Sequence, residues 1–197
     1  MFGGAFDPPH NAHVALARAA IEQLQLDTLY VFPTGQAWHK ARALSPAVHR
    51  LAMTKLAFAD QPAAVVDGRE LQRQGPTYTV DTLGELHYEH PQARLFLVIG
   101  ADHARALQGW RRWADIRQMT IVSIAARDDL TLDGIEFSSK LLDESEPQSG
   151  FVRLHMPPLA ISATNIRQRV AAGLGFDHLV APGVARYIEH HHLYLAP

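Results

Sequence analysis

Short apolar runs alternate along this chain with longer amphipathic stretches. The short runs are rich in β-branched and aromatic residues, as buried strands are, whereas the longer stretches repeat apolar residues every three or four positions, as on one helix face. The predicted strands are 28–32, 63–66, 94–99, 119–125 and 151–156. The predicted helices are 12–26, 45–58, 79–90, a segment after 102, 162–172 and 182–191.

Strands that alternate with helices predict an α/β fold, a Rossmann-like doubly wound parallel sheet with helices on both faces. The run 94–99 is almost continuously apolar, as expected for a parallel strand that is covered on both sides. The 197 residues fit one domain, in which 162–197 form a C-terminal helical part. Ligands of such sheets bind beyond the carboxyl ends of the strands.

The first strand has little room in this sequence. Only Met1 and Phe2 precede Gly3, where a central strand takes about five residues. Either that strand is nearly absent or the natural chain begins upstream of Met1, and we favour the second alternative as a hypothesis. Mass spectrometry of the native protein, if it found a chain that starts at Met1, would refute it.

Composition excludes several classes of protein. Apolar residues make up 47% of the chain, which excludes a disordered chain. The net charge is −2, which excludes a general nucleic-acid binder. There is no cysteine, so disulfides and thiolate zinc sites are excluded. No apolar stretch approaches the roughly 20 residues that span a bilayer, and no signal peptide is visible. We expect a cytoplasmic protein with neither nucleic acid nor membrane as a partner, and assign no chemistry to the acidic stretch 127–150.

The first motif is the stretch GGAFDPPHNAH at residues 3–13. Glycines let a backbone approach a ligand closely, and a helix that begins directly afterwards offers unpaired N–H groups to a phosphate. His10 and His13 are three residues apart and lie on one face of the first helical turn. A plain structural turn is the alternative. A zinc site would need a third ligand that no motif supplies, and no G-x-G-x-x-G string occurs.

The second motif is ISATNIR at residues 161–167. Its hydroxyls and the N–H groups of a helix start can hold phosphate oxygens, and Arg167 adds a bidentate cation. The alternative is that Ser162 or Thr164 simply caps the helix.

These two motifs resemble the GGxFxPxHxxH and ISxTxxR signatures of the HxGH-type nucleotidyltransferases. Between them, 69–83 (RELQRQGPTYTVDTL) and 99–102 (IGAD) with Trp110 resemble the bacterial nicotinate-mononucleotide adenylyltransferases. The resemblance covers nearly the whole chain in the right order. It implies an enzyme that transfers AMP from ATP to nicotinate mononucleotide, giving nicotinate adenine dinucleotide and pyrophosphate, with Mg²⁺ carried on the ATP phosphates and no metal site of its own.

The resemblance also implies roles for particular residues. The ATP-binding residues are expected to be Gly3, Gly4, Ala5, Phe6, His10, His13, Gly100, Asp102, Ser162, Thr164 and Arg167. The nicotinate-nucleotide-binding residues are expected to be Lys40, Thr79, Asp102, Trp110 and Arg111. The catalytic residues are expected to be His10, His13, Lys40 and Arg167.

Some alternatives stay open at this point. The acceptor could instead be nicotinamide mononucleotide or 4′-phosphopantetheine, or the chain could be a nucleotide sensor that binds ATP without turnover. Ala37-Trp38 stand where the family usually has Pro-Pro, which makes Trp38 a candidate lid or stacking residue. The run 190–192 (HHH) is predicted to be the solvated end of the last helix, and the sequence does not indicate an oligomeric state.

Overall fold

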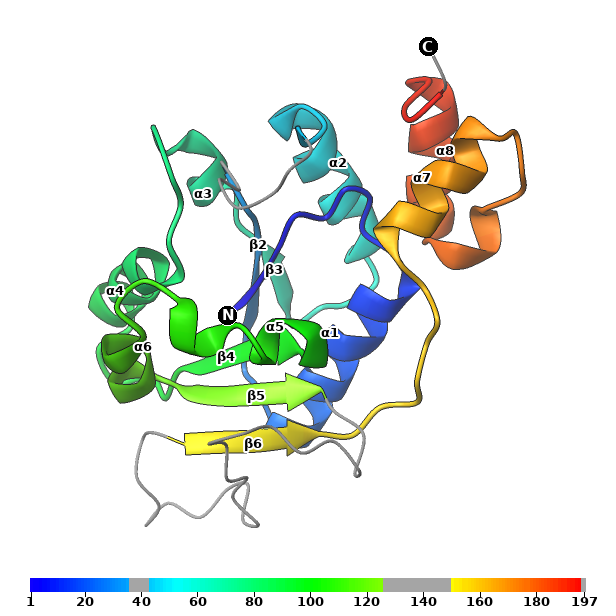
Figure 1. Ribbon diagram of the computed structural model, residues 1–197. Helices are drawn as coiled ribbons and strands as arrows, with labels where there is room; N and C mark the ends of the chain where they lie inside the picture. Colours follow the sequence, from blue (N-terminus) through cyan, green and yellow to red (C-terminus); the bar gives the residue numbers. More distant parts are fainter. Residues whose placement is uncertain (36–42, 126–149, 196–197) are drawn as a thin grey trace.

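The computed structural model describes residues 1–35, 43–125 and 150–195. Within these ranges a parallel sheet of six strands has the order β3-β2-β1-β4-β5-β6 (Figure 1). The strands are β1 (Phe2–Gly4), β2 (Leu29–Pro33), β3 (Ala64–Val66), β4 (Phe96–Gly100), β5 (Ile121–Ala125) and β6 (Gly150–Leu154). The predicted doubly wound α/β fold is confirmed.

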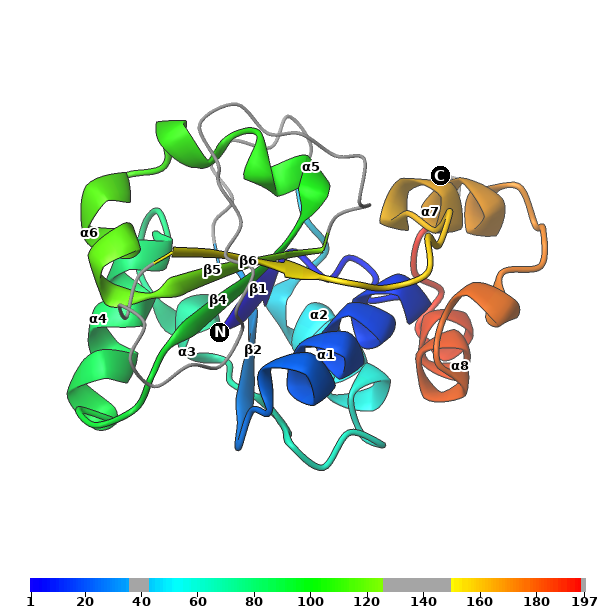
Figure 2. The same cartoon turned by 90° about the horizontal axis from the view of Figure 1, so that it is seen from below.

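Helices cover both faces of the sheet. They are α1 (Asn11–Leu24), α2 (Ala47–Ala57), α3 (Arg69–Gln72), α4 (Thr79–Glu89), α5 (Ala101–Ala104), α6 (Trp113–Met119), α7 (Ala163–Ala171) and α8 (Pro182–His190). Figure 2 shows α1 and α2 gathered on one side and α4 and α6 on the other. Val98 of β4 belongs to the core under α1, whereas its neighbours Leu97 and Ile99 belong to the core under α4 and α6. This alternation explains why the strand is apolar throughout.

The central strand β1 is short. It pairs with β2 at three positions and with β4 at one, Phe2 opposite Val98. The two neighbouring strands, with five residues each, therefore extend past it at one end. The Gly3-Gly4 segment lies at the carboxyl end of β1, where the chain turns toward α1.

The C-terminal part lies beside the sheet rather than on it (Figure 1). After β6, residues 155–161 lead into α7, and α8 follows. Helix α8 packs against α2. His190, His191 and His192 are exposed at the end of α8, as predicted. Apart from Gly150, the acidic stretch 127–150 lies outside the described residues. Among the helices that the structure describes, none is long and apolar enough to cross a membrane.

Candidate functional site

A cavity of about 850 Å³ opens at the carboxyl ends of the central strands. Three segments surround it: the loop from β1 into α1, the start of α5 after β4, and residues 156–167. Most of the residues that the sequence assigned to ATP line this cavity, and so does Trp110 from the acceptor set. They are Gly3, Gly4, Ala5, Phe6, His10, His13, Gly100, Trp110, Ser162, Thr164 and Arg167.

The two glycines of the first motif have different structural roles. A Cβ on Gly4 would lie 3.0 Å from the ring tip of Phe6, which folds back over this glycine with a left-handed backbone, φ 47°. Phe6 is 1% exposed and meets Phe2 and Phe58 edge to face, so its ring has little room to retreat. Around Gly3, by contrast, no described atom lies within 4 Å of a Cβ. The space for a close approach therefore lies at Gly3, whereas Gly4 makes room for Phe6.

His10 and His13 form a stacked pair, with ring centroids 3.7 Å apart. Nδ1 of His13 accepts a hydrogen bond from the backbone N–H of His10 at 3.1 Å. A nitrogen that accepts carries no proton, so the neutral ring of His13 is protonated on Nε2, which is its donor. Burial lowers the pKa of His10 to about 4 from an ordinary 6.5. At neutral pH the His10 imidazole is therefore neutral and keeps one N–H to donate.

The second motif brings the guanidinium of Arg167 to the cavity. Arg167 lies on α7 and donates through Nη1 to the carbonyl of Asp7 at 2.7 Å and through Nη2 to the hydroxyl of Thr164 at 3.1 Å. The Ser162 hydroxyl accepts from the backbone N–H of Asn165 at 3.1 Å, so it caps the helix. The structural alternative for Ser162 is thus realised, while the residue still lines the cavity.

The residues predicted for the acceptor are only partly brought together. Trp110 lines the cavity, but Thr79 and Arg111 do not. The guanidinium of Arg111 lies 4.5 Å from the ring centroid of Tyr78, so residues 110–111 lie beside the start of α4, where Thr79 stands. Asp102 belongs to α5, and its side chain is not described. Lys40 and Trp38 lie outside the described residues.

Comparison with known proteins places the chain in a family. The cytidylyltransferase-like family model matches residues 1–169. A curated relative from Albidiferax ferrireducens is 55% identical over 98% of this chain and 96% of its own length, and one from Methylibium petroleiphilum is 39% identical over 100% and 92%. Both bear the name "Probable nicotinate-nucleotide adenylyltransferase". The chain belongs to the nicotinate-nucleotide adenylyltransferase family.

A solved structure agrees with the fold of the family. Nicotinic acid mononucleotide adenylyltransferase of Plasmodium falciparum, complexed with NaAD, superimposes with a TM-score of 0.71. The match covers 98% of this chain and 95% of the Plasmodium chain. Because the sequence identity is 19%, the likeness shows the fold alone. The resemblance drawn from the motifs is confirmed by the curated relatives.

Three residues beside the cavity were missed by the sequence reasoning, although each is well buried or tightly bonded. Asp7 is 2% exposed and accepts a hydrogen bond from Tyr194 at 2.7 Å. Arg50 is 3% exposed and donates to three carbonyl groups, those of Ala5, Thr34 and Ser45. Asp7 stands within the first motif and could have been singled out. Arg50 and Tyr194 give no local signal.

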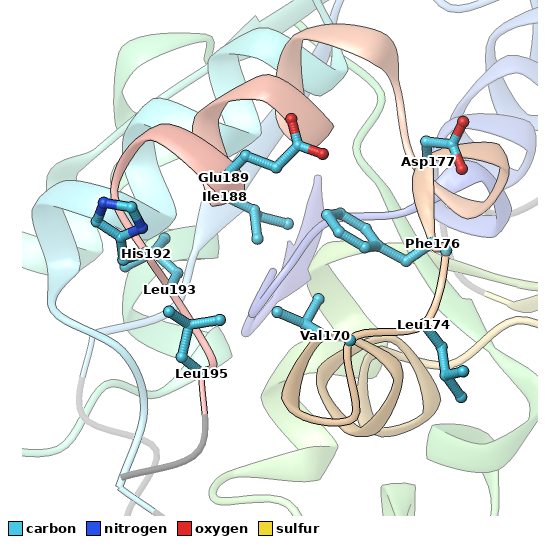
Figure 3. A pocket seen from close by; sticks show the side chains of 11 residues that line it. Val170, Leu174, Phe176, Asp177, Ile188, Glu189, His192, Leu193 and Leu195 are labelled. Carbon is cyan, nitrogen blue, oxygen red and sulfur yellow. The ribbon is translucent and has the colours of Figure 1, made fainter.

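A second hollow, of about 370 Å³, lies between α7 and the end of α8. Figure 3 shows Val170, Phe176 and Ile188 facing one another across it, with Asp177 and Glu189 nearby. It is lined by the C-terminal part of the chain and not by the strand ends. In the described ranges, 1–35, 43–125 and 150–195, no three His, Asp or Glu side chains are grouped so that they could hold a metal ion.

Proposed function

We propose that this chain transfers AMP from ATP to nicotinate mononucleotide, forming nicotinate adenine dinucleotide and releasing pyrophosphate. One observation carries the proposal: two imidazoles and a guanidinium meet at one cavity with the starts of two helices, α1 and α7. Such an arrangement suits a polyphosphate. The 55% identity to a curated relative of that name, over nearly the whole of both chains, supports the same reaction.

The reaction is an in-line displacement at phosphorus. A phosphate oxygen of nicotinate mononucleotide forms a bond to the α-phosphorus of ATP, and the bond from that phosphorus to the oxygen bridging to the β-phosphate breaks. The electron pair of the broken bond leaves with pyrophosphate, so no covalent intermediate with the protein is needed. The contribution of the protein is then positioning and stabilisation of charge.

We propose that three side chains stabilise that charge. Because Nδ1 of His13 accepts from the backbone N–H of His10, its Nε2 is the nitrogen that can donate to a phosphate. His10 stacks on His13 and adds a second donor, which is neutral. Arg167 brings a positive charge, held in place through Asp7 and Thr164. Because hydrogen bonds already hold His13 and Arg167, these two donors need little reorganisation when charge develops on the phosphates.

Magnesium belongs to the substrate in this proposal. Mg²⁺ binds phosphate oxygens and retains several waters, so it can arrive with ATP without a cage of protein carboxylates. The carboxylate of Asp7 lines the cavity, but its two oxygens accept from the Tyr194 hydroxyl and the Ser45 backbone N–H. We propose Mg-ATP as the species that binds.

The acceptor half of the site follows the resemblance. We propose that Trp110 stacks on the pyridine ring, while the Thr79 hydroxyl and the backbone N–H of Arg111 take the carboxylate. Exchanging that carboxylate for an amide would leave donors unpaired, at about 1–3 kcal/mol each, so the acid is favoured. Lys40 and Asp102 keep the expected roles as predictions.

Pyrophosphate release tests the proposal. The protein is incubated with ATP and Mg²⁺, and with nicotinate mononucleotide, nicotinamide mononucleotide or 4′-phosphopantetheine in separate reactions. We expect rapid release with the acid and slow release with the amide. No release with the acid would overturn the proposed function, whereas equal rates would overturn only the preference for the acid. One catalytic domain over 1–197 and a cytoplasmic location remain predictions, which expression of the chain alone and cell fractionation test.

A further inference from the structure

Asp7 connects the loop between β1 and α1 to three distant parts of the chain. Its carboxylate accepts from the backbone N–H of Ser45, 38 residues away, at 3.1 Å and from the hydroxyl of Tyr194, 187 residues away, at 2.7 Å. Its backbone carbonyl accepts from Arg167, 160 residues away, at 2.7 Å. The residue that positions the guanidinium of Arg167 is therefore itself held by the C-terminal segment.

Tyr194 reaches Asp7 from the segment that follows α8. Its backbone is left-handed, φ 65°, a conformation that tyrosine rarely adopts and that the surrounding structure must hold in place. Burial and the negative charge of Asp7 raise the pKa of its hydroxyl well above the usual value, so the group stays protonated and donates. Tyr194 is absent from the described residues that line the cavity. Its hydrogen-bonded link to the cavity therefore runs through Asp7, which does line it.

Arg50 completes the network around Asp7. Its guanidinium donates to the carbonyls of Ala5 at 3.0 Å, Thr34 at 2.7 Å and Ser45 at 3.0 Å, on both sides of the loop. Burial lowers the pKa of Arg50, and the nearby negative charge of Asp7 opposes this shift. The loop is thus bonded by Arg50 at the carbonyl of Ala5 and by Tyr194 and Arg167 at Asp7.

We propose that Tyr194 is a positioning residue for ATP: its hydrogen bond fixes Asp7, and the Asp7 carbonyl in turn fixes the Arg167 guanidinium at the cavity. The C-terminal segment then forms part of the ATP site, although it supplies no lining residue of its own. This inference rests on the proposed function only in taking ATP as the ligand.

The test is Tyr194→Phe, with Tyr187→Phe as the matched control. Both substitutions delete one tyrosine hydroxyl near the interface of α8 with α2, but the hydroxyl of Tyr187 bonds Nδ1 of His49 at 3.1 Å and does not contact Asp7. We expect Tyr194→Phe to weaken binding of a non-hydrolysable ATP analogue roughly tenfold, the size expected for a hydrogen bond to a charged group. KM for the mononucleotide should stay within twofold, and Tyr187→Phe should leave both values unchanged.

A double-mutant cycle with Arg167→Ala tests the route. If Tyr194 acts through Arg167, adding Tyr194→Phe to Arg167→Ala should weaken analogue binding less than twofold further. Full additivity would overturn the proposal, and so would analogue binding by Tyr194→Phe within twofold of the original protein. A similar loss in Tyr187→Phe, with thermal unfolding lowered equally in both, would show a structural role only. Because analogue binding needs no acceptor, the cycle is decided even if pyrophosphate release with nicotinate mononucleotide fails.

Discussion

The cavity at the strand ends and the hollow between α7 and α8 are both concave and partly apolar, yet their polar groups differ in kind. The cavity is lined by His10, His13 and Arg167 and by the starts of α1 and α7. The hollow carries the carboxylates of Asp177 and Glu189 among apolar side chains. Nucleotide phosphates are polyanions, so hydrogen-bond donors and helix starts suit them, whereas exposed carboxylates do not.

The two regions also differ in how firmly their polar groups are held. His13 is fixed by a backbone N–H, and Arg167 by a carbonyl and a hydroxyl. The side chain of Asp177, by contrast, is 79% exposed, and its Oδ1 lies as far as 3.7 Å from Nδ1 of the exposed His178 ring. Donors that are fixed in advance stabilise developing charge without reorganising, whereas exposed groups must first be ordered. What distinguishes the cavity from the hollow is therefore the set of hydrogen bonds that hold its polar side chains, more than its concave shape.

The largest effect is expected from His13→Ala. This substitution removes a donor whose tautomer the backbone fixes, and the loss of one such donor typically costs on the order of 10²–10³ in rate. The fold should persist, because the helix start keeps its other hydrogen bonds. Pyrophosphate release and far-ultraviolet circular dichroism measure the two quantities. A folded variant with full turnover would remove this histidine from the proposed mechanism.

His10 should make the protein sensitive to acid. Its pKa is about 4 in the folded protein against an ordinary 6.5, so the unfolded chain takes up a proton first as the pH falls. Stability is therefore lost as the pH falls from 6.5 toward 4. At pH 4.5 the loss from this one group should be roughly 2–3 kcal/mol relative to pH 7.

Urea unfolding of the original protein and of His10→Gln at pH 7 and pH 4.5 measures this effect. The variant should lose less free energy of unfolding over that interval, by the amount just stated. The matched control is His178→Gln, because that side chain is 62% exposed. An equal acid loss in the original protein and in His10→Gln would contradict the buried, neutral state of His10.

A smaller effect is expected on the acceptor side, where Thr79 lies at the start of α4 beside the Arg111–Tyr78 contact. Thr79→Val keeps the shape of the side chain and removes its hydroxyl. If that hydroxyl takes the substrate carboxylate, the preference for acid over amide should fall about tenfold, with ATP binding unchanged. The ratio of kcat/KM for the two mononucleotides measures it, and an unchanged ratio would exclude Thr79 from carboxylate recognition.

Local motifs explain why much of the cavity was predictable. The stretches that supply His10, His13 and Arg167 each carry their own signature, and parallel strands end at a common edge, so their meeting follows from the fold class. Strands β2 to β6 were predicted because apolar runs are strong signals, whereas β1, of three residues, and α3, of four, are too short to show a period.

The contacts behind the cavity could not be predicted in this way. The hydrogen bond of Tyr194 to Asp7 joins residues 187 positions apart, and nothing in the local sequence of either end indicates the other. Ser162 shows a different limit, since a hydroxyl at a helix start is equally suited to a cap and to a phosphate. The long-range contact of Tyr194 is decided by tertiary packing, and that of Ser162 by the local geometry of the helix start.

The smallest kinetic effects should distinguish the cavity from the hollow most directly. Leu159 lines the cavity and is 42% exposed, while Leu174 lines the hollow and is 55% exposed, so the two leucines form a matched pair. Leu159→Ser removes apolar surface from the wall of the cavity and should raise KM for ATP about fivefold, equivalent to about 1 kcal/mol of lost burial. Leu174→Ser should leave turnover and KM within twofold, because no substrate is expected there. Steady-state kinetics of both variants decide the comparison, and a larger effect from Leu174→Ser would show that the hollow contributes to the reaction.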